Sequence, residues 1–193
     1  MSPIASKNFK FFSLILIFAL PAIIAAGVYW GRGYLELTPQ SNGLLLNPPL
    51  AIEKLNIETV NGTALTAKDF AKSWWLIYVA PPECGNECAV QAGKLRSVHM
   101  ALNKNIPRVK RLMLIQAHSL PANELQQAQQ DTQLMIYNVQ NPEYLLNDCS
   151  VATQEGIFVM DPLGNIMLCY GPQQEAHLIL KDIEKLLKAS RIG

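Results

Sequence analysis

The chain has 193 residues and a formal net charge of +1, and charged residues make up only 16% of it. A balance so close to neutral gives no reason to expect a nucleic acid or a strongly acidic partner. The low charged fraction is typical of a chain with a membrane segment, and the sequence holds no long repeat and no low-complexity segment.

An apolar stretch near the N-terminus predicts a membrane anchor. Residues 11–30 contain no charged side chain, and such a stretch is long enough to cross a bilayer as a helix. Lys7 and Lys10 precede it, and Tyr29 and Trp30 close it as an interfacial aromatic anchor would. We therefore expect one transmembrane helix with its N-terminus in the cytoplasm, in a bacterial inner membrane.

The anchor divides the chain into four predicted parts. Residues 1–10 are the cytoplasmic N-terminus, 11–30 the transmembrane helix, 31–49 a linker rich in Gly and Pro, and 50–193 one periplasmic domain of ordinary size. The alternative is a signal peptide that is cleaved after the apolar stretch, where small residues stand.

The centre of the domain is an apolar run that leads into a pair of cysteines. Trp74 to Val79 are six apolar residues without alternation, which predicts a strand covered on both faces. Pro81 and Pro82 end this strand. From Cys88 the pattern becomes helical, and one face of the predicted helix carries Cys88, Ala92, Leu95, Val98, His99 and Leu102.

Cys84 and Cys88 are the candidate catalytic and metal-binding residues. Both stand at or just before the N-terminus of the predicted helix, where unpaired N–H groups and the helix dipole favour a thiolate. A thiolate attacks disulfides and binds soft metals. Three intervening residues span just under one helical turn, so the two sulfurs can close on each other or on one metal. A purely structural disulfide is the alternative.

The remaining elements predict a thioredoxin-like order. The expected elements are a hairpin at Ile52–Ala64 around Asn61-Gly62, a short helix at Thr66–Lys72, strands at Lys110–Gln116 and Leu134–Val139, a polar helix from Ser119 or Asn123 to Gln130, a helical turn at Pro142–Asn147, a hairpin of Ile157–Met160 with Ile166–Tyr170, and a helix at Glu175–Ala189. Strands that alternate with helices indicate parallel pairing. The predicted fold is α/β: a three-layer α/β/α domain with a central mixed sheet and an N-terminal hairpin.

With this layout the chain resembles the Sco/SenC family of membrane-anchored thioredoxin-like proteins, and in particular Sco-related proteins of proteobacteria. The resemblance rests on the anchor, on the strand that leads into Cys84-x-x-x-Cys88, on the hairpin motif Asp161-Pro162-Leu163-Gly164, and on the stretches 107–112 and 181–187. It implies a role in the assembly of cytochrome c oxidase, by copper handling or by thiol reduction of the copper site. The implied partners are a subunit of that oxidase or another assembly factor, together with the inner membrane.

The resemblance implies copper held by Cys84, Cys88 and a third ligand. Family members use a histidine before the Asp-Pro-x-Gly hairpin, but this chain has none there. Counting back from Gly164 places the position near Thr153, and a loop four residues longer places Cys149 there. Cys149 and His118 are therefore candidate third ligands. A disulfide between Cys149 and Cys169, or two inert thiols, is the alternative for that cysteine. His99 is expected to be a packed histidine and His177 a surface one.

Two other functions stay open. The first is a general periplasmic thiol–disulfide oxidoreductase, although the loop before Ile157 lacks the proline that thioredoxin-type catalysts place there. The second is a non-catalytic scaffold for an assembly complex, which would work without its cysteines.

Overall fold

The computed structural model describes residues 3–31, 41–116, 126, 128–190 and 192. The chain divides into two compact units, Met1–Gln40 and Ser41–Gly193, and we describe each by itself. The polar helix expected from Ser119 or Asn123 to Gln130 falls largely outside the described residues.

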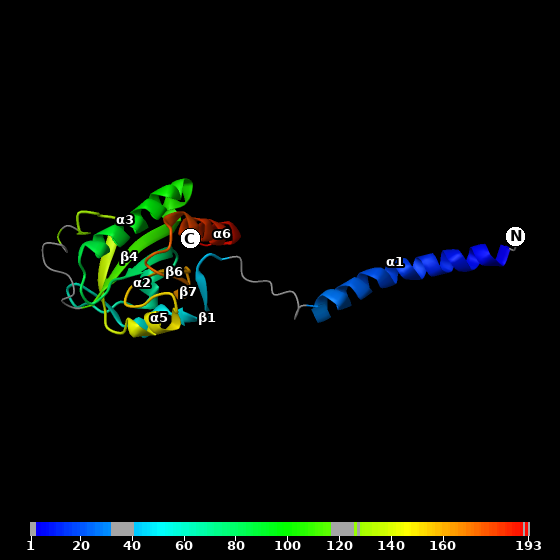
Figure 1. The fold of residues 1–193 in the computed structure, drawn as a ribbon, viewed down its shortest axis with the longest axis horizontal. Helices are drawn as coiled ribbons and strands as arrows, with labels where there is room; N and C mark the ends of the chain where they lie inside the picture. Colours follow the sequence, from blue (N-terminus) through cyan, green and yellow to red (C-terminus); the bar gives the residue numbers. More distant parts are fainter. Residues whose placement is uncertain (1–2, 32–40, 117–125, 127, 191, 193) are drawn as a thin grey trace. The chain divides into compact units, whose positions relative to one another are not determined.

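The first unit contains one helix, α1 (Pro3–Gly31), which includes the stretch predicted as a membrane anchor (Figure 1). Large apolar side chains of this helix are exposed, among them Phe18 and Trp30. Of the helices formed by the described residues, none combines the length and apolar character that a membrane crossing requires.

The second unit is built around a seven-stranded mixed sheet with the order β1-β7-β6-β3-β4-β5-β2. The strands are β1 (Leu44–Ala51), β2 (Ile57–Thr59), β3 (Trp74–Val79), β4 (Val109–Ile115), β5 (Leu134–Val139), β6 (Gly156–Met160) and β7 (Asn165–Tyr170). Strands β3, β4 and β5 run parallel, and β6 lies antiparallel to β3. The predicted mixed sheet of a thioredoxin-like fold is therefore confirmed.

Helices cover both faces of the sheet, as predicted. The helices α3 (Asn86–Ala101) and α6 (Ala176–Ala189) pack on one face (Figure 1). The opposite face is covered by the 3₁₀ helix η1 (Ile52–Leu55), α2 (Ala67–Phe70) and α5 (Glu143–Asp148). A second 3₁₀ helix, η2 (Asn103–Arg108), connects α3 to β4. Each face buries its own hydrophobic cluster, and the sheet separates the two clusters.

Strand β1 corrects the predicted domain boundary. It begins at Leu44, inside the stretch predicted as linker, and pairs antiparallel with β7. Leu46 and Leu50 are buried against the sheet, so this apolar patch is an edge strand of the domain. The prolines that suggested a linker are tolerated because an edge strand need not donate every N–H to a neighbour.

The N-terminal hairpin is shorter than predicted. The segment Ile52–Leu55 forms η1, in which both terminal residues are buried, since a period of three places them on one side. The turn around Gly62 is present, with a positive φ at that glycine. The two arms of this hairpin are joined by a single bridge, between Glu58 and Ala64. The strand β2 makes its regular ladder with β5.

The second hairpin is confirmed and its turn is held by one side chain. β6 and β7 pair antiparallel, and the Asp161 carboxylate accepts hydrogen bonds from the backbone N–H groups of Leu163 and Asn165 at 2.8 and 2.9 Å. Gly164 takes a positive φ that a side chain would oppose. Asp-Pro-x-Gly is therefore a turn motif here.

Candidate functional site

The central strand delivers the two candidate cysteines to one edge of the sheet. All six residues of β3 are buried, and the strand lies between β4 and β6. Its pairing with β4 extends to Ala80, whose N–H donates to Leu114 O at 2.9 Å. The prolines that follow cannot continue the ladder, so the chain leaves the sheet directly before Cys84.

Cys84 and Cys88 form a disulfide across the start of α3. Their Cα atoms lie 5.6 Å apart, within the ordinary range for a disulfide. Gly85 is the N-cap residue of α3, and Cys88 is the third residue of the helix. The structure thus brings the two predicted site residues together at a helix N-terminus, as the spacing indicated.

The disulfide is nearly buried, but its loop is open to solvent. The side chains of Cys84 and Cys88 are 5% and 3% exposed. Gly85, between them, is exposed, and a Cβ added there would meet no atom within 4 Å. A partner can therefore approach the pair from the side of this glycine.

Tyr78 lies directly beneath the pair. Its ring is fully buried on the α3 face of β3, and its hydroxyl is 3.5 Å from Cys88 Sγ. The same hydroxyl donates to Glu155 Oε2 at 2.5 Å. Burial, and then the hydrogen bond and charge of Glu155, raise the pKa of Tyr78 far above its usual value. This side chain therefore remains a hydroxyl at any ordinary pH.

Tyr78 and Glu155 were not among the site residues predicted from the sequence. A signal for the tyrosine was present, because a buried phenol in an otherwise apolar strand needs a hydrogen-bond partner. Nothing local identifies the partner, since Glu155 lies 77 residues further along the chain, directly before β6.

Two side chains of α3 hold the loop that leads into α6. Gln91 Nε2 and Lys94 Nζ both donate to Pro172 O, at 3.0 and 2.5 Å. Burial lowers the pKa of Lys94, and the charge of Glu155 opposes that shift. The Lys94 ammonium thus interacts with the charge of Glu155, the carboxylate that holds the Tyr78 hydroxyl.

Cys149 belongs to a second disulfide, with Cys169. Both residues are fully buried in the cluster on the α5 face, whereas Cys84 and Cys88 belong to the cluster on the α3 face. The sheet separates the two disulfides. The proposal of Cys149 as a third copper ligand is therefore wrong for this state of the protein, and the structural alternative is confirmed.

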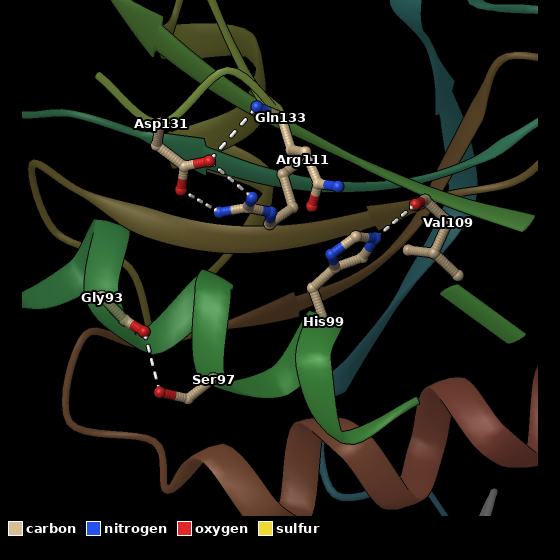
Figure 2. A network of polar contacts seen from close by, with 7 residues as sticks. All are labelled: Gly93, Ser97, His99, Val109, Arg111, Asp131 and Gln133. Carbon is tan, nitrogen blue, oxygen red and sulfur yellow. Dashed lines mark hydrogen bonds and ion pairs between the residues drawn. The ribbon is translucent and has the colours of Figure 1, made fainter. Parts of the chain in front are cut away.

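The three histidines have separate positions. His99 is buried in α3, and its Nε2 lies 2.7 Å from Val109 O, so the expected packing role is confirmed (Figure 2). His177 is exposed beside Glu175, as expected of a surface residue. His118, the other candidate third ligand, lies outside the described residues.

The basic residues at the start of β4 do not form one patch. Arg111 is 1% exposed and makes a bidentate ion pair with Asp131, at 2.6 and 2.9 Å (Figure 2). Lys110 points to the opposite face, where its Nζ lies 5.3 Å from the centroid of the Trp75 ring. Arg108 donates to the backbone at the end of α6. All three therefore have structural contacts.

The pair itself supplies two sulfurs as candidate metal ligands. Among the described residues, no three His, Cys, Asp or Glu side chains come together in a way that could hold a metal ion. The described part of the chain therefore does not form the three-ligand copper site that the resemblance implied. It forms the Cys84–Cys88 disulfide with the buried hydroxyl of Tyr78 beside it.

Solved structures share this fold. Copper-bound yeast Sco1 matches with a TM-score of 0.56 at 14% identity, over 78% of this chain and 90% of that one. Copper-bound ScoI of Arabidopsis thaliana matches at 0.53 and 14% identity, over 74% and 98% of the two chains. A SCO1/SenC family lipoprotein of Bacillus anthracis matches at 0.50 and 14% identity, over 74% and 99%. The predicted resemblance to Sco proteins is confirmed at the level of the fold.

The sequence itself matches one family model. No curated protein matches the chain. The model described as "Transmembrane-like, thioredoxin-like, C-terminal domain" matches residues 74–190, from β3 through α6, and so includes both disulfides and Glu155. The chain therefore belongs to the family of transmembrane-like, thioredoxin-like C-terminal domain proteins.

Proposed function

We propose that this protein carries out thiol–disulfide exchange with the cysteines of a partner protein, through Cys84 and Cys88. The observation that carries the proposal is the Cys84–Cys88 disulfide at a helix N-terminus, beside an exposed glycine. A helix N-terminus favours the thiolate that exchange requires.

The exchange balances with the partner as the only other reactant. One thiolate of the reduced pair attacks a disulfide of the partner and forms a mixed disulfide, and a partner thiolate leaves and takes up a proton. The second cysteine then attacks the mixed disulfide. The partner ends with two thiols, and this chain ends with the Cys84–Cys88 disulfide that the structure contains. A dithiol of another protein must then reduce the pair again.

The partner that we propose is a copper site of cytochrome c oxidase during its assembly. Two cysteines must be reduced before they can bind copper, because thiolates are the ligands. The support is the fold, which this chain shares with copper-bound Sco1 and ScoI. A general oxidoreductase and a scaffold remain the competing proposals.

Copper handling, with copper as the cargo of this protein, is the second candidate function. The reduced pair supplies two soft thiolates, which suit Cu(I). The described residues add no third ligand, since Cys149 is bonded to Cys169. We therefore expect copper binding by the reduced protein to depend on Cys84 and Cys88 and to be unaffected by Cys149→Ser.

The single substitutions Cys84→Ser and Cys88→Ser test the main proposal. We expect each to abolish catalytic reduction of a peptide disulfide that carries the copper-binding cysteines of the oxidase subunit. Retention of full reduction by both variants would contradict the proposal. An oxidase that still assembles in cells with the double variant would support the scaffold instead. Equal rates with unrelated disulfide peptides would support a general oxidoreductase.

We further propose that residues 11–30 anchor the protein in a bacterial inner membrane with the domain in the periplasm. The support comes from the sequence alone: the charge-free stretch, the two preceding lysines and the aromatic pair at its end. Alkaline extraction of membranes tests the anchor, and an alkaline phosphatase fusion after Gly193 tests the orientation. Release of the protein by alkali, or an inactive fusion, would exclude this location.

A further inference from the structure

The hydroxyl of Tyr78 has one proton and two neighbouring acceptors. Oη lies 2.5 Å from the Glu155 carboxylate and 3.5 Å from Cys88 Sγ. The carboxylate is the stronger and closer acceptor, so the proton belongs to that hydrogen bond. The lone pairs of Oη are then left to face Cys88.

This arrangement has different consequences in the two redox states. A sulfur in a disulfide has no proton, so it cannot donate to the hydroxyl oxygen. In the reduced protein, the Cys88 thiol is a weak donor placed within reach of a buried acceptor. The reduced state therefore gains a hydrogen bond that the oxidised state cannot make.

We propose that Tyr78, fixed by Glu155, is a positioning residue that raises the reduction potential of the Cys84–Cys88 pair by accepting a hydrogen bond from the reduced Cys88 thiol. This inference rests on the proposed exchange function. It does not depend on the identity of the partner.

The redox step balances as a two-electron, two-proton exchange. A dithiol reductant supplies both electrons and both protons and becomes a disulfide, while the Cys84–Cys88 bond breaks and two thiols form. One of the two protons ends on Cys88 Sγ, and the resulting S–H group points to Tyr78 Oη. The hydroxyl proton stays with Glu155 throughout, so the tyrosine transfers no proton.

The surroundings of Tyr78 make this hydrogen bond effective. The side chain is fully buried and Cys88 is 3% exposed, so water competes little for either group. The Glu155 hydrogen bond also prevents the hydroxyl from turning its own proton towards the sulfur. In Tyr78→Phe the hydrogen bond to Glu155 is lost in both redox states, so its own energy largely cancels in the potential, and the remaining shift reports the contact with Cys88.

The test is Tyr78→Phe in the purified full chain, equilibrated with mixtures of reduced and oxidised dithiothreitol. Mass spectrometry after alkylation counts the free thiols at Cys84 and Cys88 separately from those at Cys149 and Cys169. We expect the equilibrium constant for reduction to fall roughly three- to tenfold, the value of one neutral hydrogen bond. A tenfold change corresponds to about 30 mV for this two-electron couple.

Tyr137→Phe is the matched control. Tyr137 lies in β5, and its hydroxyl contacts Met135 Sδ on the opposite face of the sheet from Cys88. The same chemical change there should leave the equilibrium constant unchanged. If both tyrosine variants shift the constant equally, the effect is general and the inference is overturned.

Glu155→Gln is a second variant, at a half-buried position where folding is less at risk. A neutral amide holds the hydroxyl proton less firmly, so we expect a shift in the same direction by a smaller factor. This variant decides the question if Tyr78→Phe does not fold. An unchanged or raised constant in the folded variants overturns the inference.

A spectroscopic measurement separates the hydrogen bond from a general effect on packing. In Cys84→Ser with the second disulfide intact, Cys88 is the remaining free thiol. Its Raman S–H stretching band should move to higher frequency when Tyr78→Phe is added, because hydrogen bonding lowers that frequency. An unmoved band would contradict the proposed contact. Absence of any exchange in the unaltered protein would instead contradict the proposed function.

Discussion

At the scale of single residues, Arg111 and Asp182 are buried charged groups whose contacts explain why they are tolerated. Arg111 is held by Asp131 in the bidentate geometry that suits a guanidinium. Asp182 is 2% exposed and accepts from the backbone N–H groups of Asn42 and Gly43 at 2.6 and 3.0 Å. It also accepts from the Tyr170 hydroxyl at 3.2 Å.

Because of the Arg111–Asp131 pair, we expect part of the free energy of unfolding to depend on pH in the acid range. Hydrogen bonds and charge from Arg111 lower the pKa of Asp131 below its ordinary value of 3.8. The pair therefore stabilises the fold fully above about pH 4, and this contribution is lost as the pH falls through the lower pKa of the folded state. We expect Asp131→Asn to cost about 2–3 kcal/mol near neutral pH, since it leaves a buried guanidinium without its counter-charge. Urea unfolding at a series of pH values checks both points.

The loss of stability at acid pH distinguishes the contribution of the Arg111–Asp131 pair from a general effect of acid on the fold. The Asn variant should lose less stability than the unaltered protein between pH 4 and pH 2, because it has no carboxylate to protonate at this position. Parallel curves for the two proteins would show that Asp131 contributes nothing to the acid sensitivity.

Substitution of Asp182 should lower the stability of the fold, whereas substitution of its neighbour Lys181 should not. Asp182→Ala leaves the buried backbone N–H of Gly43 and the partly buried N–H of Asn42 without their acceptor, and we expect the free energy of unfolding to fall by about 2–3 kcal/mol. Lys181 is exposed and adjacent, so Lys181→Ala should change the free energy of unfolding by less than about 0.5 kcal/mol. Equal losses in the two variants would mean that the contacts of the Asp182 carboxylate contribute nothing specific to stability.

At the scale of elements, the two disulfides have different neighbours and different roles. Cys149–Cys169 joins the end of α5 to β7 inside the apolar layer, and its two cysteines are 20 positions apart in the sequence. Cys84–Cys88 joins positions four residues apart beside an exposed glycine. The longer loop constrains the unfolded chain more strongly.

Paired alanine substitutions separate these roles. Removal of Cys149 and Cys169 should lower stability by about 3 kcal/mol, and removal of Cys84 and Cys88 by about 2 kcal/mol, in the chain-entropy estimate. Exchange activity should show the opposite pattern, with activity lost only in the second variant. Urea unfolding and a disulfide-reduction assay measure the two quantities. Loss of exchange in a folded Cys149/Cys169 variant would assign chemistry to the buried pair.

At the scale of the whole domain, strand β1 completes the sheet at one edge. It covers β7, and the residues directly before it satisfy Asp182. A chain that begins at Leu50 loses buried Leu46 and these hydrogen bonds. We expect it to be less stable than a chain that begins at Ser41 by about 3 kcal/mol or more. Denaturant midpoints of the two chains check this, and equal midpoints would return residues 44–49 to the linker.

The sequence by itself determined the elements whose signals are local. The unbroken apolar run of β3, the Asp-Pro-x-Gly turn and the spacing of Cys84 and Cys88 each depend on neighbouring residues, and the structure contains all of them. The tertiary structure alone decided the long-range contacts. Glu155 reaches Tyr78 across 77 residues, and Asp182 reaches Asn42 across 140. Such partners depend on strand order and register, and no local period or turn signal encodes them.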